Sequence, residues 1–250
     1  MIAFISDVHS NLAALEAVLA DIHAVGGSDA RIWCLGDTVG YAAQPAECLD
    51  LVLDRCEVVL AGNHDLAVSG DDRASEDVVP GLFDGGPGAG IALARQVLGS
   101  ERIARMQSLE PSALLDNVEL HHGSDRDPIW EYVRTAETAT AHLRAQQREL
   151  GAVGHTHMPL LWELPAAAEV ASGGLMPAGS SILLERGTAR VFNPGSVGQP
   201  RDRDPRAAWA SLEGGVLTFR RVDYDIAAAQ ASIRAAGLPT ETADRLELGW

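Results

Sequence analysis

The sequence predicts an α/β protein in which two packed sheets are flanked by helices. In the first half of the chain, short apolar runs alternate with stretches of helical periodicity, which is typical of a parallel sheet and its covering helices. In the second half, short runs are divided by Gly or Pro turns, which is typical of antiparallel strands. A chain of 250 residues can bury one full core, so residues 1–250 are predicted to form a single domain.

The first half consists of repeated strand and helix units. Strands are predicted over residues 2–5, 32–35 and 58–60. Between the first two strands, apolar residues recur on one helical face, namely Leu12, Leu15, Val18, Leu19 and Ile22. Gly26 and Gly27 end that helix, and a second helix is predicted over 45–53. Residues 66–90 are acidic and glycine-rich, so we expect them to form a mobile surface connection.

The second half mixes helices with short strands. Helices are predicted over residues 91–98, 101–109, 135–149 and 226–236. Strands are predicted over residues 118–120, 150–153, 181–185, 189–192, 207–212 and 216–222. Residues 166–180 are rich in Ala and Gly without periodicity, so we expect a loop on the far side of the fold.

The composition argues against two kinds of partner. With 35 acidic and 19 basic residues, the formal charge of -16 opposes a nucleic-acid groove, because binding a polyanion requires Lys and Arg to neutralise phosphates. The chain has no signal-peptide pattern and no run of about 18 apolar residues, so we expect a cytoplasmic protein without a membrane segment.

The three cysteines of the chain form no C-x-x-C pair and are interpreted as small core residues. No pattern specifies the oligomeric state.

Four polar segments each follow a predicted strand. They are Asp7-Val8-His9, Gly36-Asp37, Gly62-Asn63-His64-Asp65 and Gly154-His155-Thr156-His157. Ligands bind at the carboxyl ends of strands in open α/β sheets, and these segments supply oxygen and imidazole ligands for two metal ions. Either longer segment alone arises by chance with a probability on the order of 0.001 to 0.01, so the interpretation depends on the ordered set. The set predicts metal-assisted hydrolysis.

With these segments the chain resembles the calcineurin-like metallophosphoesterase superfamily, and more narrowly its small, cap-less prokaryotic branch of YfcE-like phosphodiesterases. The likeness spans nearly the whole chain. Beyond the four segments it rests on Ser10-Asn11, Thr38-Val39-Gly40-Tyr41, His122-Gly123-Ser124, Met158-Pro159 and residues 193–202. The resemblance implies a four-layer αββα sandwich of two mixed β-sheets flanked by helices, with a binuclear metal site.

The family pattern implies which residues bind the two divalent ions. It assigns Asp7, His9 and His157 to one ion, Asn63, His122 and His155 to the other, and Asp37 to a bridge between them. Strand alternation sends His121 and His122 to opposite faces, and the family pattern selects His122. Mixed carboxylate, amide and imidazole ligands suit Mn, Fe, Co, Ni or Zn better than Mg or Ca, and manganese is favoured.

The resemblance also implies catalytic roles. His64 would stabilise the phosphoryl oxygens and protonate the leaving alkoxide, while Asp65 would hold its ring and favour the protonated form. A hydroxide between the metals would attack phosphorus in line. Arg201 is a candidate for phosphate binding because a guanidinium pairs with oxyanions, although its segment also suits a purely structural turn. Many relatives have Gly-Pro where this chain has Ala42-Ala43, so the family pattern does not predict the shape of the rim beside Asp37.

These expectations favour a metal-dependent phosphoric ester hydrolase, and within that class a phosphodiesterase acting on small phosphodiesters. A phosphomonoesterase, including a protein Ser/Thr phosphatase, is an alternative, but such relatives usually carry an arginine in the Gly-Asp motif. A dinucleoside polyphosphate hydrolase stays open, and a non-catalytic scaffold is disfavoured because the ligand set is complete. His23 and His142 lie in helical patterns and are interpreted as structural, and Ser10 and Asn11 as helix caps.

Overall fold

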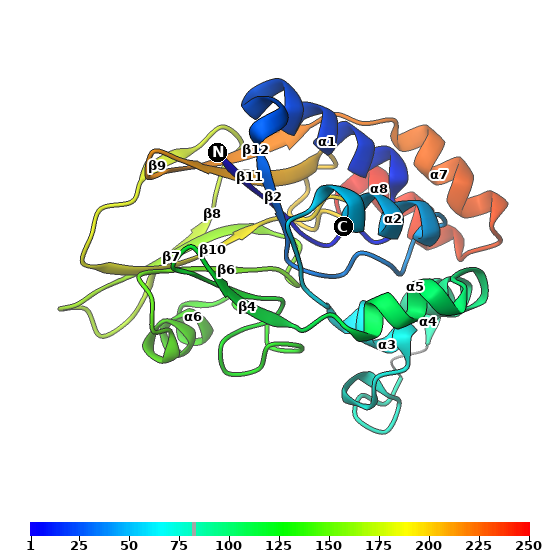
Figure 1. The fold of residues 1–250 in the computed structure, drawn as a ribbon, viewed down its shortest axis with the longest axis horizontal. Helices are drawn as coiled ribbons and strands as arrows, with labels where there is room; N and C mark the ends of the chain where they lie inside the picture. Colours follow the sequence, from blue (N-terminus) through cyan, green and yellow to red (C-terminus); the bar gives the residue numbers. More distant parts are fainter. Residues whose placement is uncertain (82–83) are drawn as a thin grey trace.

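The computed structural model describes residues 1–81 and 84–250, and its centre is a pair of mixed β-sheets packed face to face (Figure 1). Among these residues, the first sheet has six strands in the order β3 (Val58–Val59), β2 (Arg31–Cys34), β1 (Ile2–Ile5), β11 (Ala207–Glu213), β12 (Val216–Val222) and β9 (Ser181–Leu183). Strands β1, β2 and β3 are parallel, whereas β11, β12 and β9 join them in antiparallel pairs. Strands from both halves of the chain therefore share one sheet.

The second sheet has the same mixed character. Its strands within the described chain are β4 (Ser112–Leu115), β5 (Val118–His121), β6 (Leu150–Val153), β10 (Thr188–Pro194), β7 (Pro159–Pro165) and β8 (Ser172–Leu175), in that order. Strands β5, β6 and β10 are parallel, and the other pairs are antiparallel. Both sheets therefore have a set of parallel strands whose carboxyl ends can carry ligands.

Helices cover the outer faces of the sheets (Figure 1). On the first sheet lie α1 (Leu12–Gly26) and α2 (Pro45–Arg55), with α7 (Ile226–Ala235) and α8 (Thr240–Leu248) packed beside α1; α6 (Ala136–Ala145) covers the second sheet. At one end of the sandwich, α3 (Asn63–Ser69), α4 (Gly85–Val97) and α5 (Ser100–Gln107) pack together, and η1 (Gly27–Asp29) and η2 (Asp72–Ala74) are short 3-10 turns. Within the described residues, every helix is too short or too polar to cross a bilayer.

The alternation of side chains along β1 explains the layers. Phe4 points between the sheets, where its ring centroid lies 5.2 Å from that of Trp33 and 4.9 Å from that of Phe192, both edge to face. Such aromatic pairs contribute roughly 0.5–1.5 kcal/mol each beyond the area they bury. Ala3 and Ile5 face the opposite side and pack with residues of α1. The order helix, sheet, sheet, helix confirms the predicted αββα sandwich.

The expectation of a surface connection over residues 66–90 is wrong at both ends of that segment. Its start belongs to α3 and its end to α4, with η2 between them, and residues 82–83 lie outside the described part of the chain. Helix α4 starts at Gly85, and Pro87 falls in its first turn, where a missing N–H has no helical partner to lose. Buried Ile91 then holds the helix against its neighbours.

The expectation of a loop over residues 166–180 is wrong in part, because β8 lies within it. A Cβ on Gly173 would lie 2.0 Å from the carbonyl oxygen of Leu161 in β7, so the absence of a side chain lets this edge strand pair closely. The helix predicted over 135–149 ends earlier, at Ala145. No prediction covers β4, β7 or α8.

Candidate metal centre

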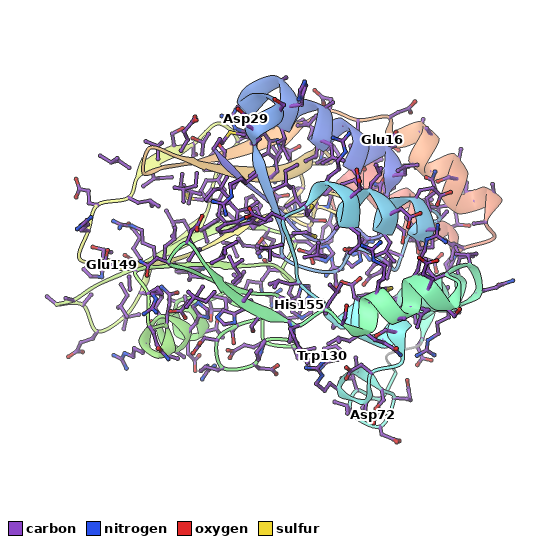
Figure 2. The ribbon with its side chains drawn as sticks, in the orientation of Figure 1. Glu16, Asp29, Asp72, Trp130, Glu149 and His155 are labelled. Atoms are coloured by element: carbon purple, nitrogen blue, oxygen red, sulfur yellow. The ribbon has the colours of Figure 1, made fainter. Side chains whose placement is uncertain are left out.

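The loops that follow the parallel strands of both sheets meet at one edge of the sandwich. Asp7 follows β1 and Asp37 follows β2, while α3 begins directly after β3. In the second sheet, His122 follows β5 and residues 154–157 follow β6. Figure 2 shows His155 between the second sheet and the helices α3 to α5, with Trp130 nearby. The fold thus brings together segments that lie far apart in the sequence.

A first ligand group contains Asp7, His9, Asp37 and His157, whose ligand atoms all lie within 4.8 Å of one another. The Nε2 atom of His9 lies 3.0 Å from Nε2 of His157 and 3.6 Å from Oδ2 of Asp37. The Oδ1 atom of Asp7 lies 3.4 Å from Nε2 of His157. Metal bonds of about 2.0–2.2 Å place neighbouring ligand atoms about 3 to 3.5 Å apart, so this group has the spacing of ligands around one cation.

A second ligand group contains Asp37, His122 and His155, again within 4.8 Å of one another. The Nε2 atom of His122 lies 3.2 Å from Nδ1 of His155 and 3.1 Å from Oδ1 of Asn63. The Oδ2 atom of Asp37 lies 3.6 Å from Nε2 of His122 and 3.6 Å from Nε2 of His9. Asp37 therefore belongs to both groups, which is where a bridging carboxylate was predicted.

Backbone carbonyl groups orient three of the imidazole rings. The Nδ1 atoms of His9, His122 and His157 donate to the carbonyl oxygens of Val39, Leu35 and Gln199 at 3.1, 2.9 and 2.7 Å, respectively. A carbonyl oxygen only accepts, so each Nδ1 carries the proton and each Nε2 presents a lone pair to its ligand group. Two such lone pairs facing each other at 3.0 Å, as in His9 and His157, repel unless a cation lies between them.

Among the described residues, the buried carboxylates of the two ligand groups have no positively charged imidazole beside them to balance their charge. Burial raises the pKa of Asp7 to about 7 and the pKa of Asp37 well above its usual range. Burial also lowers the pKa of His9 and His157 well below the ordinary value, so these rings are neutral and do not balance the carboxylates. Within the described part of the chain, the buried Oδ1 of Asp7 has no hydrogen-bond partner. Divalent cations fit this donor set, because they would supply both the missing charge and the missing partner.

The backbone at five of the predicted ligands is left-handed. The φ angles are 54° for Asp7, 48° for His9, 54° for Asp37, 66° for His155 and 59° for His157. For a residue with a Cβ this conformation costs roughly 1–2 kcal/mol, and it persists where the surrounding structure enforces it. Such strain concentrates at functional sites, and here it occurs at the residues that converge on the two ligand groups.

Two glycines allow the close contacts on which this edge depends. A Cβ on Gly62 would lie 2.0 Å from Oδ1 of Asp37, and a Cβ on Gly40 would lie 2.4 Å from Nδ1 of His64. Gly40 also has a φ of +94°, which L side chains rarely adopt. The backbone N–H of His64 donates to Oδ1 of Asp37 at 2.9 Å. The two glycines therefore determine how Asp37 and the His64 ring are placed.

The His64 ring lies beside the first ligand group. Its centroid is 4.8 Å from the centroid of His9 and 4.8 Å from that of Tyr41. Burial, followed by the charges of Arg201 and His122, lowers the pKa of His64 to about 3, so the ring is neutral in this structure. The expectation that a carboxylate partner favours the protonated ring is not met here.

Asp65 makes different contacts from those expected of it. Its Oδ2 accepts from the backbone N–H groups of Gly62 and Thr38 at 3.0 and 3.2 Å, and its Oδ1 accepts from that of Val39 at 3.1 Å. The prediction that Asp65 holds the His64 ring is therefore wrong, because both oxygens bind backbone groups. Asp65 instead joins the start of α3 to the loop after Asp37 and acts as a positioning residue.

A cavity of about 220 Å³ opens over the two ligand groups. Its lining includes His64, Arg201 and three aromatic residues, Tyr41, Trp130 and Tyr132. The Nη2 atom of Arg201 donates to Oη of Tyr41 at 3.2 Å and to Oε1 of Gln199 at 2.8 Å. On the other side, the ring of Tyr132 stacks on that of His155 with a centroid distance of 4.1 Å. Arg201 thus lines the cavity over the two ligand groups, and its role in phosphate binding stays a prediction.

Sequence reasoning missed the aromatic walls of this cavity. Trp130 and Tyr132 lie in a loop that has no recognisable motif, and Tyr41 lies in a quoted motif but received no role. The sequence signal for such a wall was a tyrosine, Tyr41, directly after Gly40 in that motif. Ala42 and Ala43, the departure from the family pattern, pack against α7 and α8 and are absent from the residues that line the cavity.

Residues 193–202 connect the loops of the two sheets. The side chain of Asn193 donates to Oγ1 of Thr156 at 2.9 Å, and Oγ of Ser196 donates to the carbonyl oxygen of Asp7 at 2.7 Å. Asn11, which caps α1 as predicted, donates to the carbonyl oxygen of Gly198 at 2.9 Å. These contacts support a structural role for residues 193–202, and they leave room for Arg201 of the same segment to bind phosphate.

Comparisons with known proteins agree with this geometry. Residues 1–215 match the family model described as the calcineurin-like phosphoesterase superfamily domain. Uncharacterized protein MJ0912 of Methanocaldococcus jannaschii is 34% identical over 257 residues, which cover 100% of this chain and 98% of that protein. The crystal structure of a metallophosphoesterase from Sphaerobacter thermophilus has 38% identity and a TM-score of 0.85, covering 100% of this chain and 99% of the other. Hypothetical protein PH1004 from Pyrococcus horikoshii OT3 shares the fold, with a TM-score of 0.78, 20% identity and coverage of 100% and 99%.

Proposed function

Since the chain belongs to the calcineurin-like phosphoesterase superfamily and is a metal-dependent phosphoester hydrolase, we propose that it is a phosphodiesterase acting on small phosphodiesters. The observation that supports this most strongly is that Asp37 belongs to both ligand groups, beside His64 and under a small cavity. Two divalent cations, for which we propose manganese, supply an activated water and balance the charge on the phosphoryl oxygens when bound. The narrower YfcE-like branch stays a prediction.

The side chains around the ligand groups have separate tasks in this proposal. Arg201 binds an anionic phosphoryl oxygen through its guanidinium. His64 donates a proton to the leaving oxygen, since a phosphate anion beside the neutral ring favours its protonated form. Asp65 keeps the His64 backbone in place by holding the start of α3. Removal of a general acid of this kind lowers the rate by roughly 10²- to 10⁴-fold.

The cavity supports a small substrate. At about 220 Å³ it has room for a phosphoryl group and part of one substituent, and Tyr41, Trp130 and Tyr132 offer apolar walls for that substituent. The formal charge of -16 opposes binding of a nucleic-acid polymer. We further propose that the protein acts in the cytoplasm, in keeping with its three free cysteines.

One observation favours a second candidate, a phosphomonoesterase. The Gly-Asp motif lacks the arginine of many phosphatases, but Arg201 brings a guanidinium to the same cavity from a distant loop. We favour the diester because the Nη2 of Arg201 already binds Tyr41 and Gln199, and one partly engaged guanidinium suits a monoanion better than a dianion.

The experiment that tests the proposal compares two chromogenic esters. Bis-p-nitrophenyl phosphate and p-nitrophenyl phosphate are offered to protein stripped with chelator and then given Mn²⁺, Ni²⁺, Zn²⁺ or Mg²⁺ separately. We expect a higher kcat/KM for the diester, and the highest turnover with Mn²⁺. A higher kcat/KM for the monoester with every ion would replace the diesterase by a phosphomonoesterase.

A further inference from the structure

The outer face of the second sheet carries a cluster of one imidazole and two carboxylates, on the opposite side of β5 from His122. Leu120 points between the sheets, so Glu119 and His121 point outward, toward α6. Asp125, in the loop after β5, lies beside them. One ligand atom from each of these three residues lies within 4.8 Å of the others. None of the three belongs to the phosphoesterase site.

His121 has an unsatisfied nitrogen directed at the two carboxylates. The residue is 8% exposed, and among the residues that the structure describes its Nε2 has no hydrogen-bond partner. This atom lies 3.7 Å from Oδ1 of Asp125 and 4.0 Å from Oε2 of Glu119. Charge-assisted hydrogen bonds are about 2.7–2.9 Å long, so direct pairing does not account for the arrangement. A buried nitrogen left without a partner costs roughly 1–3 kcal/mol, and a cation placed between the three groups would remove that cost.

Surrounding groups hold each of the three side chains in place. The Nδ1 of His121 is hydrogen-bonded to Oγ of Ser112 at 2.8 Å, and a hydroxyl that accepts there leaves the Nε2 lone pair free. The Oε1 of Glu119 accepts from the backbone N–H of Gln147 at 2.7 Å, which leaves Oε2 for another partner. The backbone N–H of Asp125 donates to Nδ1 of His142 at 3.0 Å. Metal ligands in proteins are oriented by such outer contacts.

We propose that Glu119, His121 and Asp125 bind a divalent cation of the zinc class, separate from the two at the phosphoesterase site. One imidazole and two carboxylates are suitable zinc ligands, and bonds of about 2.0–2.2 Å require the three groups to close only slightly. A cavity of about 250 Å³, lined in part by Glu119 and His121, gives the ion a route from solvent. Arg148 lines the same cavity, but its backbone N–H is the group that contacts Glu119.

The proposed cation site connects the second sheet to the loop after β5, which forms part of the wall of the phosphoesterase cavity. Asp125 lies at the start of the loop that carries Trp130 and Tyr132 into the wall of the cavity. The Oδ1 of Asp127 accepts from the backbone N–H of Trp130 at 3.1 Å, so the loop is held internally as well. A cation bound by Asp125, Glu119 and His121 would anchor that loop to β5. The role of the ion is therefore structural.

Metal counting tests the proposal. Chelator-stripped protein is reconstituted with excess Zn²⁺, desalted and analysed by elemental mass spectrometry, with circular dichroism to verify folding. We expect wild type to retain one equivalent more than Asp125→Ala, whose partly exposed side chain can be removed without burying an unpaired group. The matched control Glu137→Gln, an exposed carboxylate on α6, should bind as wild type does.

A second background separates the two sites. Asp37→Asn should lose metal from the phosphoesterase site and keep the additional equivalent, and the double variant Asp37→Asn with Asp125→Ala should lose that equivalent too. Equal metal content in wild type and Asp125→Ala, both folded, overturns the proposal. So does an Asp37→Asn protein that retains no zinc.

Discussion

Replacing Gly40 by alanine tests whether the position of the His64 ring controls turnover. A Cβ at residue 40 would lie 2.4 Å from Nδ1 of His64, and ordinary contact begins near 3.4 Å, so the ring must retreat by about 1 Å. Misplacement of a catalytic group by 1 Å lowers the rate about 10²-fold. The φ of +94° adds a backbone penalty of roughly 1–2 kcal/mol, which for a chain of this length lowers the melting temperature by roughly 2–8 °C.

The assay for Gly40→Ala measures kcat with bis-p-nitrophenyl phosphate, together with metal content and melting temperature. Gly70→Ala is the matched control, because Gly70 has a φ of +78° and a Cβ there would meet no atom of residues 1–81 or 84–250 within 4 Å. Both variants should lose stability, and only Gly40→Ala should lose about 10²-fold in kcat with its metals retained. In a His64→Ala background, Gly40→Ala should lower kcat no further. Equal kcat in the two glycine variants would show that the position of the His64 ring does not control turnover.

Three further predictions concern His64, Arg201 and His142. His64→Ala should lower kcat by about 10²- to 10⁴-fold without changing the metal content, because its ring supplies no atom to either ligand group; a parallel loss of metal on elemental analysis would contradict this role. Arg201→Lys should raise KM about tenfold or more in steady-state kinetics, since one ammonium cannot reproduce a guanidinium fork, and an unchanged KM would exclude it from phosphate binding. Burial, and to a smaller extent the charge of His121, lowers the pKa of His142 from 6.5 to about 4. The folded protein therefore resists a proton that the unfolded chain accepts, and the free energy of unfolding should fall as pH drops from about 6.5 toward 4, by roughly 2 kcal/mol at pH 5. Urea unfolding at pH 7 and pH 5 should show a smaller fall for His142→Gln, and an equal fall in both proteins would show that His142 is not responsible.

Contacts around His142 explain why it stays neutral. Its Nδ1 accepts from the backbone N–H of Asp125 at 3.0 Å, and its Nε2 donates to Oε1 of Gln146 at 3.2 Å. The amide nitrogen of Gln146 donates to the carbonyl oxygen of Arg190 at 3.1 Å, which fixes the orientation of that amide. A second proton on His142 would face a backbone N–H with no acceptor. The sequence predicted a structural residue here, and the network supports that interpretation.

The strands and the ligand loops could be predicted because each depends on local pattern. An apolar run that ends at a polar residue, as at Ile5 before Asp7, marks both the end of a strand and a side chain placed at the edge of the sheet. Strand alternation also predicted that His121 and His122 point to opposite faces, and the structure places them so; the choice of His122 came from the family resemblance.

Other features depend on contacts between distant segments and left no local signal. Helix α4 begins among glycines because Ile91 and its neighbours bury one face, and β8 pairs through its backbone although Gly173 has no side chain to show alternation. Tyr132 becomes a cavity wall only because its loop folds over His155. The resemblance assigned Asp65 to the His64 ring, but the turn after Asp37 presents backbone N–H groups that bind the Asp65 carboxylate instead.

Metal reconstitution tests whether Asp37 joins two cation sites that together hydrolyse a phosphoester. Hydrolysis of bis-p-nitrophenyl phosphate is measured for wild type and Asp37→Asn, each stripped with chelator and then titrated with Mn²⁺. We predict that stripped wild type is inactive, that Mn²⁺ restores it, and that Asp37→Asn stays inactive at every Mn²⁺ concentration. Full turnover by stripped wild type, or by Asp37→Asn, would show that hydrolysis does not depend on cations joined by Asp37.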